Sequence, residues 1–315
     1  MTQAPTPTAD TVRRLARSLL DDGGAGVGAA SAAGPDVRPV TEDGATWWVG
    51  NRHVLRLAPN REVSARRRRE ARLRDLVRPH VPVALPAGVA QGEWAPGLLC
   101  TLDTRLPGGT AEEHAVSAVG ETDLAGLLTG LREVPARQAE TLGVPRVSPR
   151  SLDALRRVAA EAAEQLAAAD EFDPVRLRRL TPSAAVQLAA QSGTAVLVHH
   201  ALSGRHLLVG ADGRVRGVLG WDAAVVGDPA EDIAGLALAV GAPAAVRAAT
   251  LAGYGARPCL RGLWLARCDA LIQLSGALAV RPAPPLRPPR LRLRRAWEPI
   301  MLERVTDLGD GDEAP

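Results

Sequence analysis

Residues 195–240 constrain the fold of this 315-residue chain more than any other segment. Two runs of leucine and β-branched residues flank a turn at Asp212-Gly213, a pattern typical of two short strands joined as a hairpin. Asp228 follows as a helix N-cap, with Pro229 at the first helical position and the apolar run IAGLALAV soon after it. The hairpin therefore fixes the register between the loop that enters its first strand and the loop that leaves its second.

Three stretches of this segment form a continuous pattern: LVHHALSGRHLLV from residue 197, GVLGW from residue 217 and GDPAEDIA from residue 227. The pattern resembles the catalytic core of the aminoglycoside/macrolide phosphotransferase family, whose members read LVHGDLHPGNLLV, GVIDW and GDPAxDLA. The resemblance is strong over residues 197–235 and moderate over residues 35–110. It implies an α+β, protein kinase-like two-lobed fold, with a small β-rich N-lobe and a larger, mainly helical C-lobe. It also implies ATP or GTP and a small hydroxylated substrate such as an aminoglycoside, a macrolide or a sugar.

This chain departs from the family pattern at three positions that carry its chemistry. Ala201 stands in place of the catalytic aspartate, His206 in place of a metal-binding asparagine, and Gly220 in place of the second metal-binding aspartate. Alanine cannot accept the proton of an attacking hydroxyl, a role worth roughly 10²–10⁴-fold in rate. Mg²⁺ prefers oxygen ligands, which the side chains of histidine and glycine do not offer. We therefore expect standard Mg²⁺-dependent phosphoryl transfer to be lost.

The N-terminal third carries the pattern of the corresponding N-lobe. Strands are expected at VRPV, TWWV and HVLRL, and a helix over residues 61–77 that stops at Pro79. By the resemblance, Arg56 occupies the cation position of the third strand and Glu70 the helix glutamate that pairs with it, so that the cation would hold nucleotide phosphates. The alternative is an exposed strand residue and one more charge on a solvated helix. If the pair is retained, we expect ATP or GTP to bind weakly and without Mg²⁺.

Two nearby residues could replace part of the lost chemistry. Asp222 lies two residues beyond Gly220 and would project on the same side if the strand continued, displaced by about 6–7 Å. His199 matches a histidine that the family keeps for hydrogen bonding within the loop. Together with His200 and His206 these side chains suggest a transition-metal site, but their spacing matches no standard zinc motif. We therefore predict no metal site.

Composition excludes several classes of protein. All 38 basic residues are arginine and the net charge is only +3, so the pI of 9.2 reflects the high pKa of arginine, and we expect no nucleic-acid partner. Cys100, Cys259 and Cys268 are widely spaced and odd in number, which argues against a disulfide framework or a zinc site. No segment approaches ~18 uninterrupted apolar residues and the first residues hold no apolar signal core, so we expect a cytoplasmic protein without membrane contact.

The chain is expected to comprise four segments. They are an N-terminal helix and flexible linker (residues 1–34), the N-lobe (35–105), the C-lobe with the altered loops (106–280) and a Pro/Arg-rich connector, terminal helix and acidic tail (281–315). The last segment is interpreted as a strap over the C-lobe or, alternatively, as an interaction surface.

Helices are predicted at three places in the C-lobe. One begins after Ser151 and carries an apolar stripe, a second begins at Thr181-Pro182, and a third is a buried helix within residues 262–280. The prolines of the following connector are expected to keep it out of a helix. The stripe consists of Leu152, Leu155, Val158, Ala162 and Leu166.

Three functions fit this sequence. The first is a pseudokinase that binds a small molecule, a nucleotide or a protein partner without phosphoryl transfer. The second is an active ATP- or GTP-dependent small-molecule phosphotransferase, of the antibiotic-resistance or natural-product-tailoring type, with a remodelled site. The third is an arginine-surface module that docks onto another protein.

Overall fold

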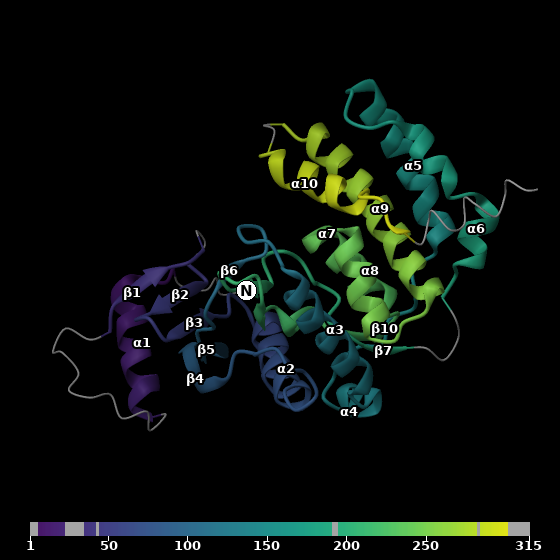
Figure 1. Ribbon diagram of the computed structural model, residues 1–315. Coiled ribbons are helices and arrows are strands. Elements are labelled where there is room, and N and C mark those ends of the chain that lie inside the picture. Colours follow the sequence, from purple (N-terminus) through teal and green to yellow (C-terminus); the bar gives the residue numbers. More distant parts are fainter. Residues whose placement is uncertain (1–5, 23–34, 42–43, 191–194, 282–283, 302–315) are drawn as a thin grey trace, which may run out of the picture.

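The computed structural model describes residues 6–22, 35–41, 44–190, 195–281 and 284–301, arranged in two lobes (Figure 1). A five-stranded sheet and two helices form the N-lobe, on the left, and helices dominate the C-lobe, on the right. The expected α+β, two-lobed architecture is therefore confirmed.

The N-lobe sheet is antiparallel throughout, with strand order β1-β2-β3-β5-β4. In β3, Leu55 and Leu57 are buried in the N-lobe core, whereas Val54 and Arg56 line the space between the lobes. This alternation follows from the two-residue period of a strand. The strands are β1 (Val37–Pro39), β2 (Thr46–Val49), β3 (His53–Leu57), β4 (Gly88–Ala95) and β5 (Leu98–Thr104), of which the first three are those predicted.

Two helices flank this sheet. Helix α1 (Ala9–Asp22) contributes Val12, Ala16 and Leu19 to the same core as Leu55, so it covers the face of the sheet opposite the C-lobe (Figure 1).

Helix α2 (Arg61–Val77) has the predicted bounds and begins at Asn60, whose side chain accepts the Val63 amide at 2.8 Å. Its residues Leu73 and Val77 belong to the C-lobe core. Helix α2 of the N-lobe therefore packs against the C-lobe through these residues.

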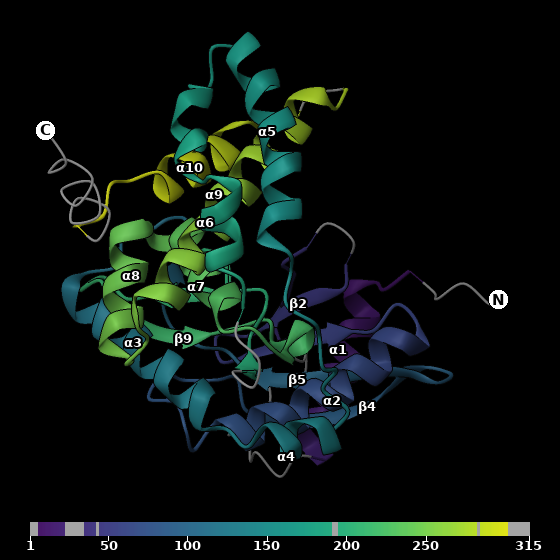
Figure 2. The ribbon, with the colours of Figure 1, turned by 90° about the vertical axis from the view of Figure 1, so that its right-hand side faces the viewer.

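One large apolar core organises the C-lobe. Strands β6 (Gly109–Thr110), β8 (Leu207–Val209) and β9 (Val215–Val218) form one antiparallel sheet, and β7 (Val196–Val198) pairs with β10 (Val225–Gly227). Figure 2 shows α5 and α10 beside α9, on the side of the lobe away from the N-lobe sheet. The helical elements are α3 (Ala118–Glu133), α4 (Ala136–Thr141), α5 (Leu152–Ala168), η1 (Pro174–Arg179), α6 (Pro182–Gln187), η2 (Trp221–Ala223), α7 (Ala230–Val240), α8 (Ala242–Leu251), α9 (Ala256–Ala279) and α10 (Arg287–Ala296).

The predicted hairpin is present as β8 and β9. Gly213 adopts a φ of +74° in the turn, and the Asp212 carboxylate accepts the Arg214 amide at 3.2 Å. The pairing continues past the strands, because the Leu219 amide donates to the His206 carbonyl at 2.9 Å. This register brings the loop before β8 next to the loop after β9.

The helices predicted after Ser151 and at Thr181 are present, and one predicted detail differs. Ser151 and Thr181 cap α5 and α6 through their hydroxyl groups, as expected. The apolar stripe of α5 passes through Ala159, which is fully buried, so the prediction of Val158 as a stripe residue was wrong and its side chain is 50% exposed.

Helix α10 contradicts the prediction that the prolines exclude a helix. Pro288 and Pro289 lie in its first turn, where the missing amide hydrogens would have no partner within the helix. Arg290 pairs with Glu171, and Arg295 donates to the carbonyl of Ala111. These contacts support the interpretation of this segment as a strap, here a helical one.

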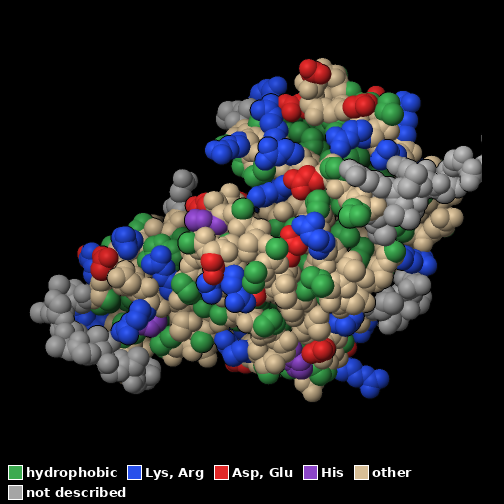
Figure 3. All heavy atoms as spheres, viewed as in Figure 1, with side chains coloured by type: hydrophobic (Ala, Val, Ile, Leu, Met, Phe, Trp, Pro, Cys, Tyr) green, Lys and Arg blue, Asp and Glu red, His purple; other side chains and the backbone are tan. Residues whose placement is uncertain are grey.

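Arginine side chains gather over α5 and α10 on the face shown in Figure 3, mixed with acidic ones. The predicted linker over residues 23–34 and the acidic tail after residue 301 lie outside the described residues. Within the described ranges, no helix is both long enough and apolar enough to cross a membrane.

Candidate functional site

A cavity of about 410 Å³ lies between the lobes, and the substituted C-lobe position Gly220 and the N-lobe residue Arg56 both line it. At one end, the Arg105 guanidinium stacks on the Trp48 ring, 4.1 Å from the ring centroid. The remaining lining residues include Thr46, Val54, Glu70, Arg74, Asp103, Arg205, Leu208 and Leu219. The two halves of the predicted site therefore share one cleft.

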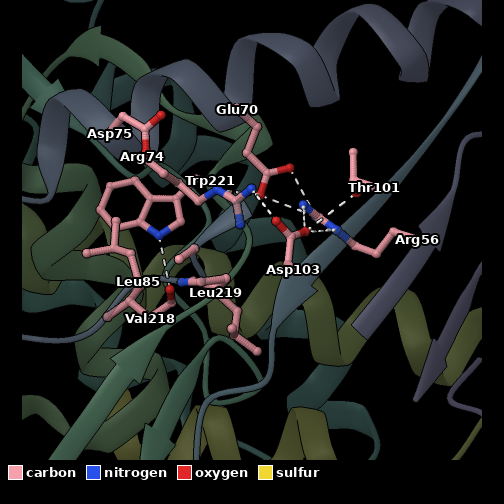
Figure 4. Close-up of polar contacts among 12 residues, drawn as sticks. Arg56, Glu70, Arg74, Asp75, Leu85, Thr101, Asp103, Val218, Leu219 and Trp221 are labelled. Carbon is pink, nitrogen blue, oxygen red and sulfur yellow. Dashed lines mark hydrogen bonds and ion pairs between the residues drawn. The ribbon is translucent and has the colours of Figure 1, made fainter. Parts of the chain in front are cut away.

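The predicted contact between Arg56 and Glu70 is confirmed (Figure 4). Arg56 Nη1 lies 3.2 Å and 3.0 Å from the two carboxylate oxygens of Glu70. Arg56 has a second partner that the sequence did not indicate, because its Nε and Nη2 both donate to Oδ2 of Asp103, at 3.2 Å and 3.0 Å. The role of this pair toward a nucleotide stays a prediction.

Arg74 completes a buried network of two guanidinium groups and two carboxylates. Its Nη2 donates to Asp103 Oδ1 at 2.8 Å, and its Nε lies 3.9 Å from Glu70 Oε1. Glu70, Arg74 and Asp103 are each only 2% exposed, so their charges depend on one another for stabilisation. Burial lowers the pKa of Arg56, but the carboxylates of Glu70 and Asp103 outweigh this effect and raise it above its ordinary value.

On the C-lobe side, the His206 ring lies between the two other substituted positions. Its Nδ1 donates to the Ala201 carbonyl at 2.5 Å. A Cβ atom added to Gly220 would lie 2.7 Å from His206 Nε2, and Gly220 has a φ of +78°. The imidazole therefore lies against the Ala201 backbone and occupies the space that a side chain at position 220 would need.

His199 holds the same loop from inside. It is fully buried, its Nε2 donates to the Leu219 carbonyl at 2.8 Å, and its Nδ1 accepts the Ala201 amide at 3.4 Å. Burial, reinforced by the charge of nearby His206, lowers the pKa of His199 to about 3. His199 is thus a neutral side chain with both ring nitrogens engaged, consistent with the hydrogen-bonding role that the resemblance implies.

Asp232 anchors the loop from helix α7. Its two carboxylate oxygens accept the amides of His199 and His200, each at 2.8 Å. Burial raises the pKa of Asp232 to about 7, against the opposing effect of these two hydrogen bonds. The prediction of Asp228 as N-cap and Pro229 as first helical residue was wrong by one position, because α7 begins at Ala230 with Pro229 as its N-cap; the Asp228 carboxylate accepts the Ala230 amide at 3.0 Å.

The strand does not continue from Gly220 to Asp222, so the condition under which Asp222 would project on the same side as position 220 is not met. Strand β9 ends at Val218, and Gly220 leads into the 3₁₀ turn η2. Asp222 is exposed in this turn, and its carbonyl accepts a hydrogen bond from Arg69 of α2 at 3.1 Å. Asp222 as a substitute for the residue lost at position 220 therefore has no support from strand geometry.

The donor set in this part of the cleft does not suit Mg²⁺. Positions 201 and 220 have no side-chain oxygen, and His206 offers only a ring nitrogen. Across the ranges that the structure describes, no group of three or more His, Cys, Asp or Glu side chains is placed to hold a metal ion.

The two-lobed fold with its interlobe cleft is shared with a known family. The model of the phosphotransferase enzyme family matches residues 36–263. The chain belongs to the phosphotransferase enzyme family. No curated protein sequence matches it.

Solved structures of similar fold are aminoglycoside and macrolide phosphotransferases. The GDP complex of aminoglycoside 2'-phosphotransferase-IIIa is 17% identical, with a TM-score of 0.63 over 90% of this chain and 98% of that chain. Macrolide 2'-phosphotransferase from Brachybacterium faecium, without ligand, is 22% identical, with a TM-score of 0.55 over 90% of this chain and 98% of that chain. The complex of streptomycin, ATP and APH(2")-IIa is 15% identical, with a TM-score of 0.56 over 88% and 95%. At these identities the likeness shows the kinase-like fold.

Three residues of the site were missed from the sequence. Arg74 stands four residues after Glu70, a spacing that places both on one helix face, so its signal was present. Asp232 lies within the GDPAEDIA motif, which also marks it. Asp103 carried no signal, because its contact with Arg56 depends on the pairing of β3 with β5, 47 residues apart.

Proposed function

We propose that this chain is a pseudokinase that binds ATP or GTP in the interlobe cleft, weakly and without Mg²⁺. It acts through that binding, or through a small-molecule or protein partner, and not through phosphoryl transfer. The observation that carries the proposal is the position of the His206 ring, which occupies the space between Ala201 and Gly220. Both the acceptor for a substrate proton and the oxygen ligands for Mg²⁺ are missing from this space.

Nucleotide binding is supported by the cleft and by the structural neighbours. The cleft keeps Arg56 in contact with Glu70 at the base of a cavity of about 410 Å³. The neighbours include a GDP complex and a ternary complex with ATP and streptomycin. A nucleotide in this cleft would place its phosphates toward Arg56.

Calorimetric titration with ATP and with GTP, each with and without Mg²⁺, tests the binding. We expect weak binding whose affinity is the same within about twofold in both conditions, since no protein ligand for Mg²⁺ is present at positions 201, 206 and 220. Strong binding that requires Mg²⁺ would contradict the proposal, as would the absence of binding by either nucleotide.

A phosphotransfer assay with a panel of aminoglycosides and macrolides tests the second half of the proposal. We expect no turnover, whereas active kinases work at about 1–100 s⁻¹. Turnover in that range would instead support an active phosphotransferase with a remodelled site. Separate replacement of Asp222, His199 and His206 would then identify the residue that had taken over the lost role.

A further inference from the structure

In the N-lobe half of the cleft, a carboxylate binds the same Arg56 guanidinium that a nucleotide phosphate would need. A guanidinium group has five N–H donors, and its Nε and Nη2 edge matches the two oxygens of a carboxylate or a phosphate. In Arg56 this edge is bound by Asp103, while Nη1 is bound by both oxygens of Glu70. The Arg56 edge that would hold a phosphate with two hydrogen bonds is therefore already paired.

Asp103 is fixed in this position from behind. Its Oδ1 accepts a hydrogen bond from Arg74 at 2.8 Å, and both side chains are almost completely buried. Asp103 also lies within the continuous pairing of β5 with β3, where its Cα is opposite Val54. If Asp103 turned away from Arg56, the buried Arg74 would lose its closest counter-charge. A phosphate must therefore compete with a carboxylate that cannot easily leave.

We infer that Asp103, held by Arg74, withholds Arg56 from nucleotide phosphates and sets the low affinity of the cleft for them. The inference rests on the proposed nucleotide binding and assigns its weakness to one contact in the N-lobe, separate from the missing metal ligands of the C-lobe. Asp103 is then the residue that determines how strongly the cleft binds a polyphosphate anion, whether from a nucleotide or free.

The double substitution Arg74→Leu with Asp103→Leu tests this inference. It removes one positive and one negative charge, so the net charge of the cleft is unchanged and any gain reflects the release of Arg56. Replacing a buried ion pair by apolar side chains is often neutral for stability, so we expect a folded protein. In EDTA, ATP and tripolyphosphate should bind at least about tenfold more tightly than to the wild type, because Arg56 regains two charge-assisted hydrogen bonds. Adenosine binding should not change.

Two control variants separate the contact from side effects. Adding Arg56→Ala to the double variant should abolish the gain in polyphosphate affinity. This result would show that the gain depends on Arg56. The pair Arg247 and Glu121, bound through two hydrogen bonds of 2.6 Å and 2.7 Å between α8 and α3, gives a double leucine variant with the same change of charge away from the cleft. Its affinity for ATP and for tripolyphosphate should equal that of the wild type.

Equal or weaker polyphosphate binding by the folded Arg74→Leu, Asp103→Leu protein would overturn the inference. Failure of the proposed function is a different result, in which the wild type does not bind ATP at all. In that case tripolyphosphate decides the inference, because it probes Arg56 without the base and the sugar. Tighter tripolyphosphate binding by the double variant would still support the role of Asp103, and no gain would refute it.

Discussion

The two halves of the cleft differ in the charged side chains that they contain. In the N-lobe half, two guanidinium groups and two carboxylates form a buried network around Arg56. In the C-lobe half, residues 201, 206 and 220 have no side-chain oxygen, and the His206 ring lies against the Ala201 carbonyl and Gly220. Yet the loop of the second half is also held by buried hydrogen bonds, through His199 and Asp232. The scaffold around positions 201, 206 and 220 is therefore ordered although these positions carry no side-chain oxygen.

The largest expected effect would follow from removing the carboxylate at the centre of the N-lobe network. Asp103→Ala leaves Arg56 and Arg74 with Glu70 alone, and an uncompensated buried charge costs about 3–5 kcal/mol. His206→Asn, in the other half, loses one hydrogen bond of a partly exposed side chain and should cost only about 1 kcal/mol. Urea unfolding at pH 7 measures both. Similar costs for the two variants would mean that the halves do not differ as described.

A smaller effect should appear in the pH dependence of stability, and it belongs to the C-lobe half. His199 has a pKa of about 3 in the folded protein, below its ordinary value of 6.5, because it is buried. In the unfolded chain His199 is protonated below about pH 6.5, whereas in the folded protein it is protonated only below about pH 3. The free energy of unfolding therefore falls as the pH is lowered through this range.

His199→Gln removes this contribution while leaving that of Asp232 in both proteins. The stability advantage of the wild type over the variant should be about 2 kcal/mol smaller at pH 5 than at pH 7.5. Urea unfolding of both proteins at the two pH values gives the difference. A constant advantage would show that His199 titrates alike in the folded and unfolded states.

The smallest effect concerns the coupling between the substituted positions. Gly220→Asp alone places a Cβ 2.7 Å from His206 Nε2, so the ring must move. With His206→Asn the space is free, and the two changes should therefore couple by about 1 kcal/mol in a double-mutant cycle of unfolding free energies. Strictly additive costs would mean that the ring moves aside without loss.

Addition of Ala201→Asp to this pair gives a triple variant that tests the scaffold itself. It should fold and bind ATP in a Mg²⁺-dependent manner, because both oxygen ligands for the ion are restored and the components act together. Each single change should have little effect on the binding. A folded triple variant whose ATP affinity does not depend on Mg²⁺ would show that the C-lobe half has changed beyond these three side chains.

The sequence by itself determined the elements of secondary structure and the positions at which the chain departs from the family pattern. The bounds of α2, the β8–β9 hairpin and the caps at Ser151 and Thr181 follow from local signals, because turns and helix ends depend on neighbouring residues. The substitutions at the catalytic and metal positions were visible for the same reason, since each lies within a short continuous motif. Arg74 could have been added, because four residues on a helix make one face.

Only the tertiary structure decided how the side chains in the cleft are paired. Asp103 reaches Arg56 across the pairing of β3 and β5, which no local pattern encodes. Beyond Gly220 the chain forms the turn η2 and not a further strand, because α2 packs there and Arg69 binds the Asp222 carbonyl. The His206 ring occupies space left by Gly220, a relation that depends on the register of two loops. Contacts between distant segments are fixed by packing and by the compensation of buried charge, so they follow from the fold as a whole.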